Sequence, residues 1–129
     1  MSVLTVATHR RVYLANSTVL LARQIDAAYW EEWTLFSLPG GVQLFVLLNV
    51  PILLAVMLGF ERLPSVAGRR ISRLLAASGI FAAAFHTVHL VGGDQAFRTP
   101  VSVALRVLTA LLSPLQLAAA GRATEGTTG

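Results

Sequence analysis

The run GVQLFVLLNVPILLAVMLGF, residues 41–60, contains no formally charged side chain in twenty consecutive positions. An α-helix rises 1.5 Å per residue, so about twenty residues cover the roughly 30 Å hydrocarbon core of a bilayer. A helix of this length in a soluble domain normally presents a charged face to water. The run therefore predicts a transmembrane helix.

Three further apolar stretches accompany this run, at residues 12–30, 71–91 and 101–120. The first is the least apolar, because polar and charged residues interrupt it: Asn16, Arg23, Gln24 and Asp26. The connections between the stretches are short and contain Pro and Gly, which makes consecutive helices antiparallel neighbours. We predict an all-α, membrane-spanning, up-and-down four-helix bundle as one domain over residues 1–120, followed by a disordered polar tail at 121–129.

The composition supports a membrane protein and argues against several functions. Hydrophobic residues make up 55% of the chain and charged residues 12%, whereas about a quarter of an ordinary soluble domain is charged. The ten basic residues are all Arg and are scattered between apolar runs, which argues against nucleic-acid binding despite the net charge of +4. Cysteine is absent, so thiolate metal sites and Cys nucleophiles are excluded.

The distribution of arginine predicts the orientation in the membrane. Arginines precede the first stretch, crowd the connection between the second and third, and follow the fourth: Arg10, Arg11, Arg62, Arg69, Arg70, Arg73 and Arg122. The other two connections are acidic or mixed. By the positive-inside rule both termini are cytoplasmic, and we expect a bacterial cytoplasmic membrane whose lipid bilayer surrounds the chain.

With this orientation, the outer ends of the first and third helices lie on the same side of the membrane. The candidate polar cluster therefore joins residues from both ends: Arg23, Asp26, Glu31, Glu32, His86 and His89. His86 and His89 share one helical face at a spacing of three, as do Arg23 and Asp26, which we expect to form an ion pair.

Histidine and carboxylate side chains are the ligands of many metal sites in helical bundles. His86, His89 and Asp26 would be the ligands of such a site. The spacing of His86 and His89 does not by itself give a complete set of metal ligands. The Glu-x-x-His pattern of di-iron bundles is also missing, so we predict no metal. Metal binding, proton handling and simple polar packing stay open as alternatives, and no catalytic residue or cofactor is assigned.

Other polar and aromatic residues have simpler interpretations. Tyr29, Trp30 and Trp33 are typical of an aromatic belt at the lipid headgroups. Asn49 is expected to bridge helices by hydrogen bonds. Arg106 is expected to pair with an outer carboxylate or to extend toward water.

Three segments carry a resemblance to a known family: IDAAYWEEWTLFSLPGG at 25–41, LLNVPILL at 47–54 and FRTPVS at 97–102. They resemble an uncharacterised bacterial family of small four-helix membrane proteins. In that family the first helix ends in His-Glu-hydrophobic-Asp-Ala, followed by a Glu-Trp pair.

This chain keeps part of that motif. Its matching residues are Asp26, Ala27, Glu32 and Trp33, whereas Arg23 and Gln24 stand at the positions of the His and the Glu. Arg is no metal ligand at neutral pH and Gln cannot transfer a proton. The resemblance therefore implies the fold and no activity.

The third stretch, residues 71–91, is rich in small residues, which let membrane helices approach closely. We therefore predict an accessory or structural subunit that packs with other membrane subunits or as a homo-oligomer. The alternative is a metal-dependent enzyme or a proton-coupled small-solute transporter that uses the outer polar cluster. A lipid or quinone binder with its site between the second and third helices is a third possibility.

Overall fold

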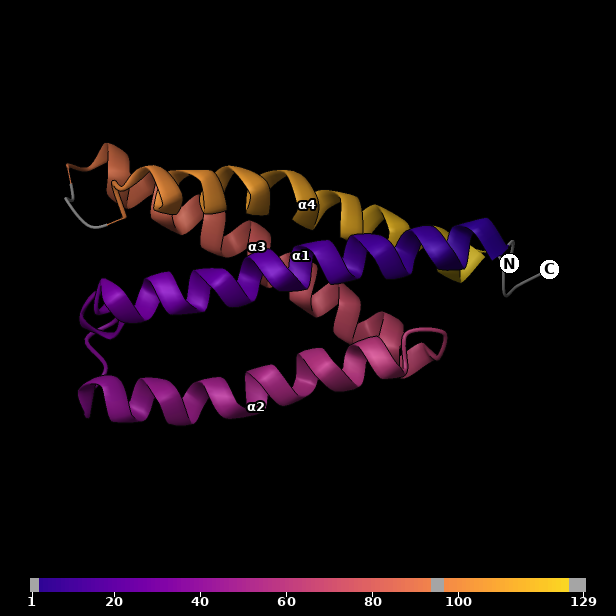
Figure 1. Cartoon of the computed structure of the whole chain (residues 1–129), viewed down its shortest axis with the longest axis horizontal. Coiled ribbons are helices and arrows are strands. Elements are labelled where there is room, and N and C mark those ends of the chain that lie inside the picture. The colour runs from indigo at the N-terminus through magenta and orange to yellow at the C-terminus, as the bar shows by residue number, and fades with distance from the viewer. Residues whose placement is uncertain (1–2, 94–96, 126–129) are drawn as a thin grey trace.

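The structure, a computed structural model, describes residues 3–93 and 97–125. Within these ranges it is entirely helical, as Figure 1 shows, and this confirms the predicted all-α fold. Its elements are α1 (Val3–Tyr29), the short 3-10 helix η1 (Glu32–Thr34), α2 (Gly41–Glu61), α3 (Val66–Val91) and α4 (Pro100–Glu125).

Three of these helices are long and apolar enough to cross a membrane, namely α2, α3 and α4. Helix α1 does not reach the same apolarity, since polar and charged side chains occupy one of its faces. That face points into the protein: His9, Asn16 and Arg23 recur every seven residues on it, and all three are buried. A seven-residue recurrence places side chains on one helix face, so α1 turns these three polar side chains away from the surroundings of the protein.

Many polar side chains lie in the interior of the protein, and many large hydrophobic side chains lie on its exterior. The largest side chains that are fully buried are Tyr13, Gln116, Asn16, Thr109, Ser72 and Ser113, whereas large hydrophobic residues of every helix are exposed. A soluble domain has the opposite distribution, because apolar surface is removed from water on folding. This arrangement is stable where hydrocarbon surrounds the helices, so we conclude that the protein is integral to a membrane.

Helices α1, α3 and α4 form a closely packed unit, with α1 and α4 side by side and α3 crossing behind α1 (Figure 1). Small residues make the approach possible. At Gly79 of α3 an added Cβ would overlap the Ser113 hydroxyl of α4, so only glycine fits there. The small face of α3, which includes Ala76, Gly79 and Ala83, is thus buried within this chain.

A hydrogen-bonded network crosses the middle of the three-helix unit. Asn16 of α1 donates to Gln116 Oε1 of α4 at 2.7 Å, and Gln116 Nε2 donates to the Ser72 carbonyl of α3 at 2.9 Å. Ser72 Oγ also lies 2.9 Å from His9 Nε2. Hydrogen bonds between membrane helices are each worth about 0.6 kcal/mol and at most about 1.7, so the network contributes through several members.

Helix α2 lies apart from this unit and contacts mainly α3 (Figure 1). Tyr13 of α1 anchors it: the phenol donates to the Val56 carbonyl at 2.6 Å and the ring packs beside Phe60. Gly59 gives this contact room, because an added Cβ would overlap both Tyr13 and Ile71. The end of α2 near Glu61 is therefore fixed to α1 and α3.

The helices extend beyond the predicted spans, most clearly at Val3, Val66 and Glu125. Apolarity marks only the part of a helix that suits hydrocarbon, and a helix can continue where its backbone is still packed, as buried His9, Arg69 and Ala123 show. The prediction of a disordered tail is wrong for residues 121–125, which continue α4. Residues 126–129 of that tail lie outside the described residues.

Candidate functional site

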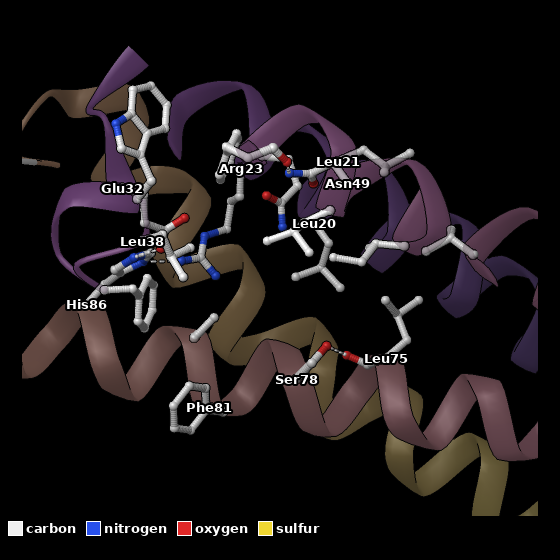
Figure 2. A pocket seen from close by; sticks show the side chains of 18 residues that line it. Leu20, Leu21, Arg23, Glu32, Leu38, Asn49, Leu75, Ser78, Phe81 and His86 are labelled. Carbon is white, nitrogen blue, oxygen red and sulfur yellow. Dashed lines mark hydrogen bonds and ion pairs between the residues drawn. The ribbon is translucent and has the colours of Figure 1, made fainter. Parts of the chain in front are cut away.

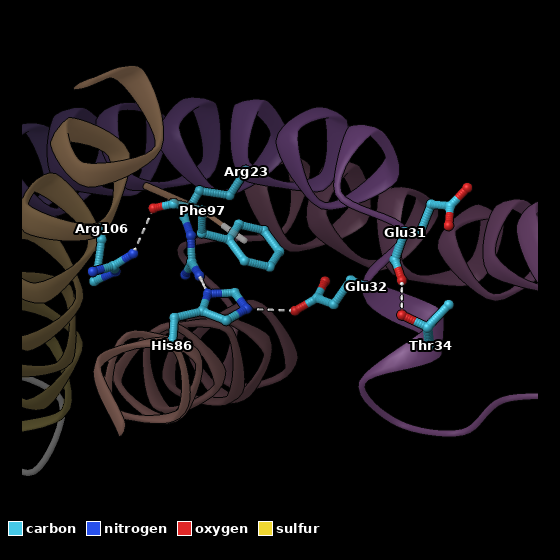
Figure 3. Close-up of polar contacts among 7 residues, drawn as sticks. All are labelled: Arg23, Glu31, Glu32, Thr34, His86, Phe97 and Arg106. Carbon is cyan, nitrogen blue, oxygen red and sulfur yellow. Dashed lines mark hydrogen bonds and ion pairs between the residues drawn. The ribbon is translucent and has the colours of Figure 1, made fainter. Parts of the chain in front are cut away.

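Three side chains from three elements meet at the end of the bundle near η1. His86 of α3 lies between Arg23 of α1 and Glu32 of η1 (Figure 3). The Arg23 guanidinium is hydrogen-bonded to His86 Nδ1, and His86 Nε2 lies 2.6 Å from Glu32 Oε1. Arg23 and His86 are buried, and the Glu32 side chain is 14% exposed. We call these residues the Arg–His–Glu trio.

The partners of His86 determine its tautomer. A guanidinium has only donors, so Nδ1 must accept from Arg23 and cannot carry a proton. Nε2 then carries the imidazole proton and donates it to the Glu32 carboxylate. His86 is therefore neutral in this arrangement, and one negative charge on Glu32 faces one positive charge on Arg23.

The segment that leads into α4 covers the trio from the other side. The Phe97 ring stacks on the His86 imidazole, with ring centroids 4.4 Å apart. Arg106 of α4 donates to the Phe97 carbonyl at 2.9 Å, and this holds the ring in place (Figure 3). Phe97 has a positive φ of 62°, a conformation that costs a bulky residue energy and is kept here by these contacts.

Asp26 does not form the expected ion pair with Arg23. Its carboxylate accepts a hydrogen bond from Ser102 of α4 at 2.8 Å, and Trp30 donates to the same Ser102 hydroxyl at 3.3 Å. Arg23 turns instead to His86, although Asp26 remains near enough to attract Arg23 and Arg106 electrostatically. A partner on another helix thus replaces the partner one turn away on α1.

The other two members of the predicted cluster lie apart from the trio. Glu31 is exposed, with a positive φ of 52°, and its carbonyl accepts from the Thr34 hydroxyl at 2.8 Å (Figure 3). His89 packs against the Phe85 ring, with centroids 4.4 Å apart. Among the described residues, no three His, Asp or Glu side chains are placed to hold a metal ion, so His86, His89 and Asp26 do not form a ligand set.

A cavity of about 380 Å³ lies between α1, α2 and α3, and the trio forms part of its wall (Figure 2). Its other lining is mainly aliphatic and aromatic, with Trp33 and Phe45 near the trio and Leu20, Val56 and Leu75 elsewhere. Its volume lies within the range of about 300–1,000 Å³ that is usual for small-molecule sites.

The cavity opens on the lipid-facing surface between α2 and α3. Several of its lining side chains are also exposed on the outside of the protein: Leu48, Ile52, Ser78 and Phe81. Figure 2 shows Ser78 and Phe81 on α3, with Asn49 across the cavity from them. A molecule dissolved in the bilayer could enter here without crossing water.

Asn49 also lines the cavity, and one of its polar atoms is unsatisfied. Its Nδ2 donates to the Phe45 carbonyl one turn earlier at 2.8 Å. Its Oδ1 is buried and has no hydrogen-bond partner among the described residues. The predicted bridge from Asn49 to another helix is therefore not made, and an acceptor is left unpaired inside the wall of the cavity.

The aromatic residues are placed differently from a simple belt. Tyr29 is 76% exposed, as a headgroup-level residue should be. Trp30 contacts the Phe97 ring and Ser102, and Trp33 faces the cavity and the Phe45 ring. Sequence reasoning missed Phe97 and Ser102, and it named a lipid site between the second and third helices only as a third possibility. The FRTPVS segment, which contains both residues, was the signal available for them.

Comparison with known protein families shows which family this chain belongs to. A family of unknown function, DUF6713, matches residues 9–123. The chain belongs to the DUF6713 family. The matched range includes the Arg–His–Glu trio and every residue that lines the cavity. No curated protein and no solved structure matches the chain. Membership of DUF6713 is consistent with the expected uncharacterised family and transfers no activity.

Proposed function

We propose that this protein is a four-span bacterial membrane protein that binds a lipid-soluble small molecule in the cavity between α1, α2 and α3. Both termini would be cytoplasmic, and the trio would then lie toward the outer side. The length of α1 supports a fourth span, since its 27 residues correspond to about 40 Å. Its buried polar face supports it too, because α3 and α4 satisfy those groups without water.

One observation carries the binding proposal: two charged side chains and a histidine form part of the wall of an otherwise apolar cavity that opens to lipid. Charged groups in a membrane are costly and usually serve a function. A trio whose sole role was to join helices would be expected in a closely packed setting, because close packing would strengthen the contacts between its charges. A space beside it gives a ligand access to its polar atoms.

The role of an accessory subunit has less support than the sequence suggested. That prediction depended in part on the small residues of α3, and three of them, Ala76, Gly79 and Ala83, are already buried within this chain. A subunit partner would have to use an outer apolar face instead. Nothing in the arrangement favours one such face over another.

Proton handling is the second candidate, and the contact between His86 and Glu32 favours it. When Arg23 releases Nδ1 and that atom takes up a proton, His86 can pass its Nε2 proton to the carboxylate 2.6 Å away and become neutral again. Such a step would suit proton-coupled movement of a small solute. A metal-dependent reaction has no comparable support, because the described residues offer no ligand set.

Native mass spectrometry of the protein, released from lipid nanodiscs, tests the binding proposal. We expect a non-covalent small-molecule adduct on the wild type. Ser78→Phe would fill the mouth of the cavity without touching the trio and should abolish the adduct. Val101→Phe, on the exposed face of α4, is the matched control and should keep it. Equal adducts in both variants, or a stoichiometric protein partner without any adduct, would argue against the proposal.

A further inference from the structure

We infer that the molecule bound in the cavity is an uncharged single-chain lipid whose head carries both a carbonyl acceptor and a hydroxyl donor, as a monoacylglycerol does. This inference rests on the proposed function, because it names the chemical class of ligand for the same cavity.

The charge balance around the cavity selects an uncharged head. Arg23 and Glu32 both reach the cavity wall with opposite charges, and His86 between them is neutral. Arg106 and Asp26 near the trio are also opposite in charge and attract each other electrostatically. A carboxylate or ammonium head would add a charge that no partner compensates in a medium of low dielectric, which is costly.

The donors at the wall select an acceptor on that head. A guanidinium has five N–H donors, and among the described residues the hydrogen bond of Arg23 goes to His86 Nδ1. The guanidinium therefore keeps N–H groups for a further acceptor. Gln24, the next residue of α1, also lines the cavity and adds an amide. An ester or ketone oxygen matches these donors without bringing a charge.

Asn49 selects a donor on the same head. Its Oδ1 is a buried acceptor without a partner among the described residues, and such a group costs free energy until a donor reaches it. Glu32 offers a further carboxylate oxygen at the cavity wall. A hydroxyl group would satisfy Asn49 Oδ1 once the amide turns from the wall toward the cavity, whereas a head with acceptors alone would leave it unpaired.

The remaining lining suits one acyl chain. Apolar side chains of α1, α2 and α3 continue from the polar end of the cavity, among them Leu20, Ile52 and Leu75. A volume of about 380 Å³ can hold a small head and the first part of one chain. The opening between α2 and α3 lets the rest of the chain extend into the bilayer.

Three probes with the same decanoyl chain test this assignment: 1-decanoylglycerol, methyl decanoate and decanoic acid. The readout is the emission of Trp33, which lines the cavity, in a Trp30→Phe protein that keeps Trp33 as its single tryptophan. We expect saturable binding of decanoylglycerol, at least about tenfold tighter than binding of the methyl ester or of the acid. This comparison needs no change to the cavity itself.

A variant pair tests the role of Asn49. Asn49→Leu should reduce the preference for decanoylglycerol over methyl decanoate to about twofold or less, because the unpaired acceptor is removed. Gln43→Leu, an exposed position on the same helix, should leave the preference unchanged. Helix content by circular dichroism would confirm that both variants are folded.

The outcomes separate this inference from the proposed function. Equal or tighter binding of decanoic acid would overturn the uncharged head and leave the cavity as a lipid site. An undiminished preference in Asn49→Leu would overturn the hydroxyl contact in the same way. No saturable response to any probe, together with no cavity-dependent adduct in native mass spectrometry, would overturn both.

Discussion

The Nε2 atom of His86 in α3 donates to the Glu32 carboxylate in η1 at 2.6 Å, and this bond joins two residues that are 54 positions apart in the chain. The same imidazole accepts from Arg23 of α1 through its other nitrogen. One neutral side chain therefore connects two opposite charges on two other elements. The packing of α1, α3 and η1 at this end of the protein depends on this connection.

Removal of His86 should destabilise the protein strongly. In His86→Ala the Arg23 guanidinium stays buried and loses its hydrogen-bond acceptor, and the link to Glu32 is lost. Leaving one partner of a buried charged network without compensation costs about 3–5 kcal/mol. Thermal or denaturant unfolding in a mild detergent, followed by circular dichroism, would measure this loss.

His89→Ala is the matched control, because it removes a histidine one turn further along α3. His89 is partly exposed and packs on the Phe85 ring, so we expect a loss below about 1 kcal/mol. If the two variants were equally stable, the trio would not hold the helices together as described.

Gly79→Ala should separate α3 from α4. The added methyl group would overlap the Ser113 hydroxyl, and overpacking of this kind costs about 1–3 kcal/mol. Gly121→Ala has open space around the new methyl group and should be neutral or stabilise α4 by up to about 1 kcal/mol. Unfolding curves of the two variants that coincide would contradict the close contact between α3 and α4.

Protonation of His9 should destabilise the fold at low pH. Burial and, to a lesser extent, the positive charge of Arg69 lower the pKa of His9 below its ordinary value of 6.5. His9 lies outside the predicted span 12–30. Since the unfolded chain binds the proton more readily, the contribution of His9 is complete above about pH 6.5 and is lost as the pH falls below that value.

Unfolding temperatures of wild type and His9→Gln between about pH 5 and pH 8 would test this effect. The wild type should lose more stability on acidification than the variant, because glutamine does not titrate in this range and can still reach Ser72. The same acid sensitivity in both proteins would show that another group is responsible.

The orientation in the membrane can be measured by labelling single cysteines, because the chain has none of its own. Glu31→Cys, at an exposed position between α1 and η1, should react with a membrane-impermeant maleimide added to intact spheroplasts. Glu61→Cys, exposed at the other end of α2, should react only after the membrane is permeabilised. The reverse pattern would place the trio on the cytoplasmic side.

Much of the fold could be predicted from the sequence, since apolar runs of about twenty residues indicate helices in a membrane with little ambiguity. The sequence also placed Arg23, Glu32 and His86 at the same end of the protein. Short connections indicated that consecutive helices are antiparallel, and the distribution of arginine indicated their orientation. Together they put the ends of the first and third helices on one side.

The pairing within the cluster could not be predicted, because it depends on how helices rotate against one another. Helical spacing favoured Arg23 with Asp26, yet Ser102 of α4 and His86 of α3 are nearer partners in three dimensions. The cavity was equally hidden, since it arises where α2 lies apart from the three-helix unit (Figure 1). Neither the rotation of the helices against one another nor the distance of α2 from the other three produces a periodic pattern in a single sequence.

The ¹⁵N spectrum of His86 in lipid nanodiscs tests the central claim most directly, namely that a neutral His86 links Arg23 and Glu32 at the wall of a ligand cavity. Histidine-selective labelling gives three side chains to distinguish, and His9→Gln and His89→Ala identify their signals. We predict a neutral His86 protonated at Nε2, with shifts that change on addition of 1-decanoylglycerol while those of His9 do not. A proton on Nδ1, or a spectrum that decanoylglycerol leaves unchanged at His86, would contradict the account.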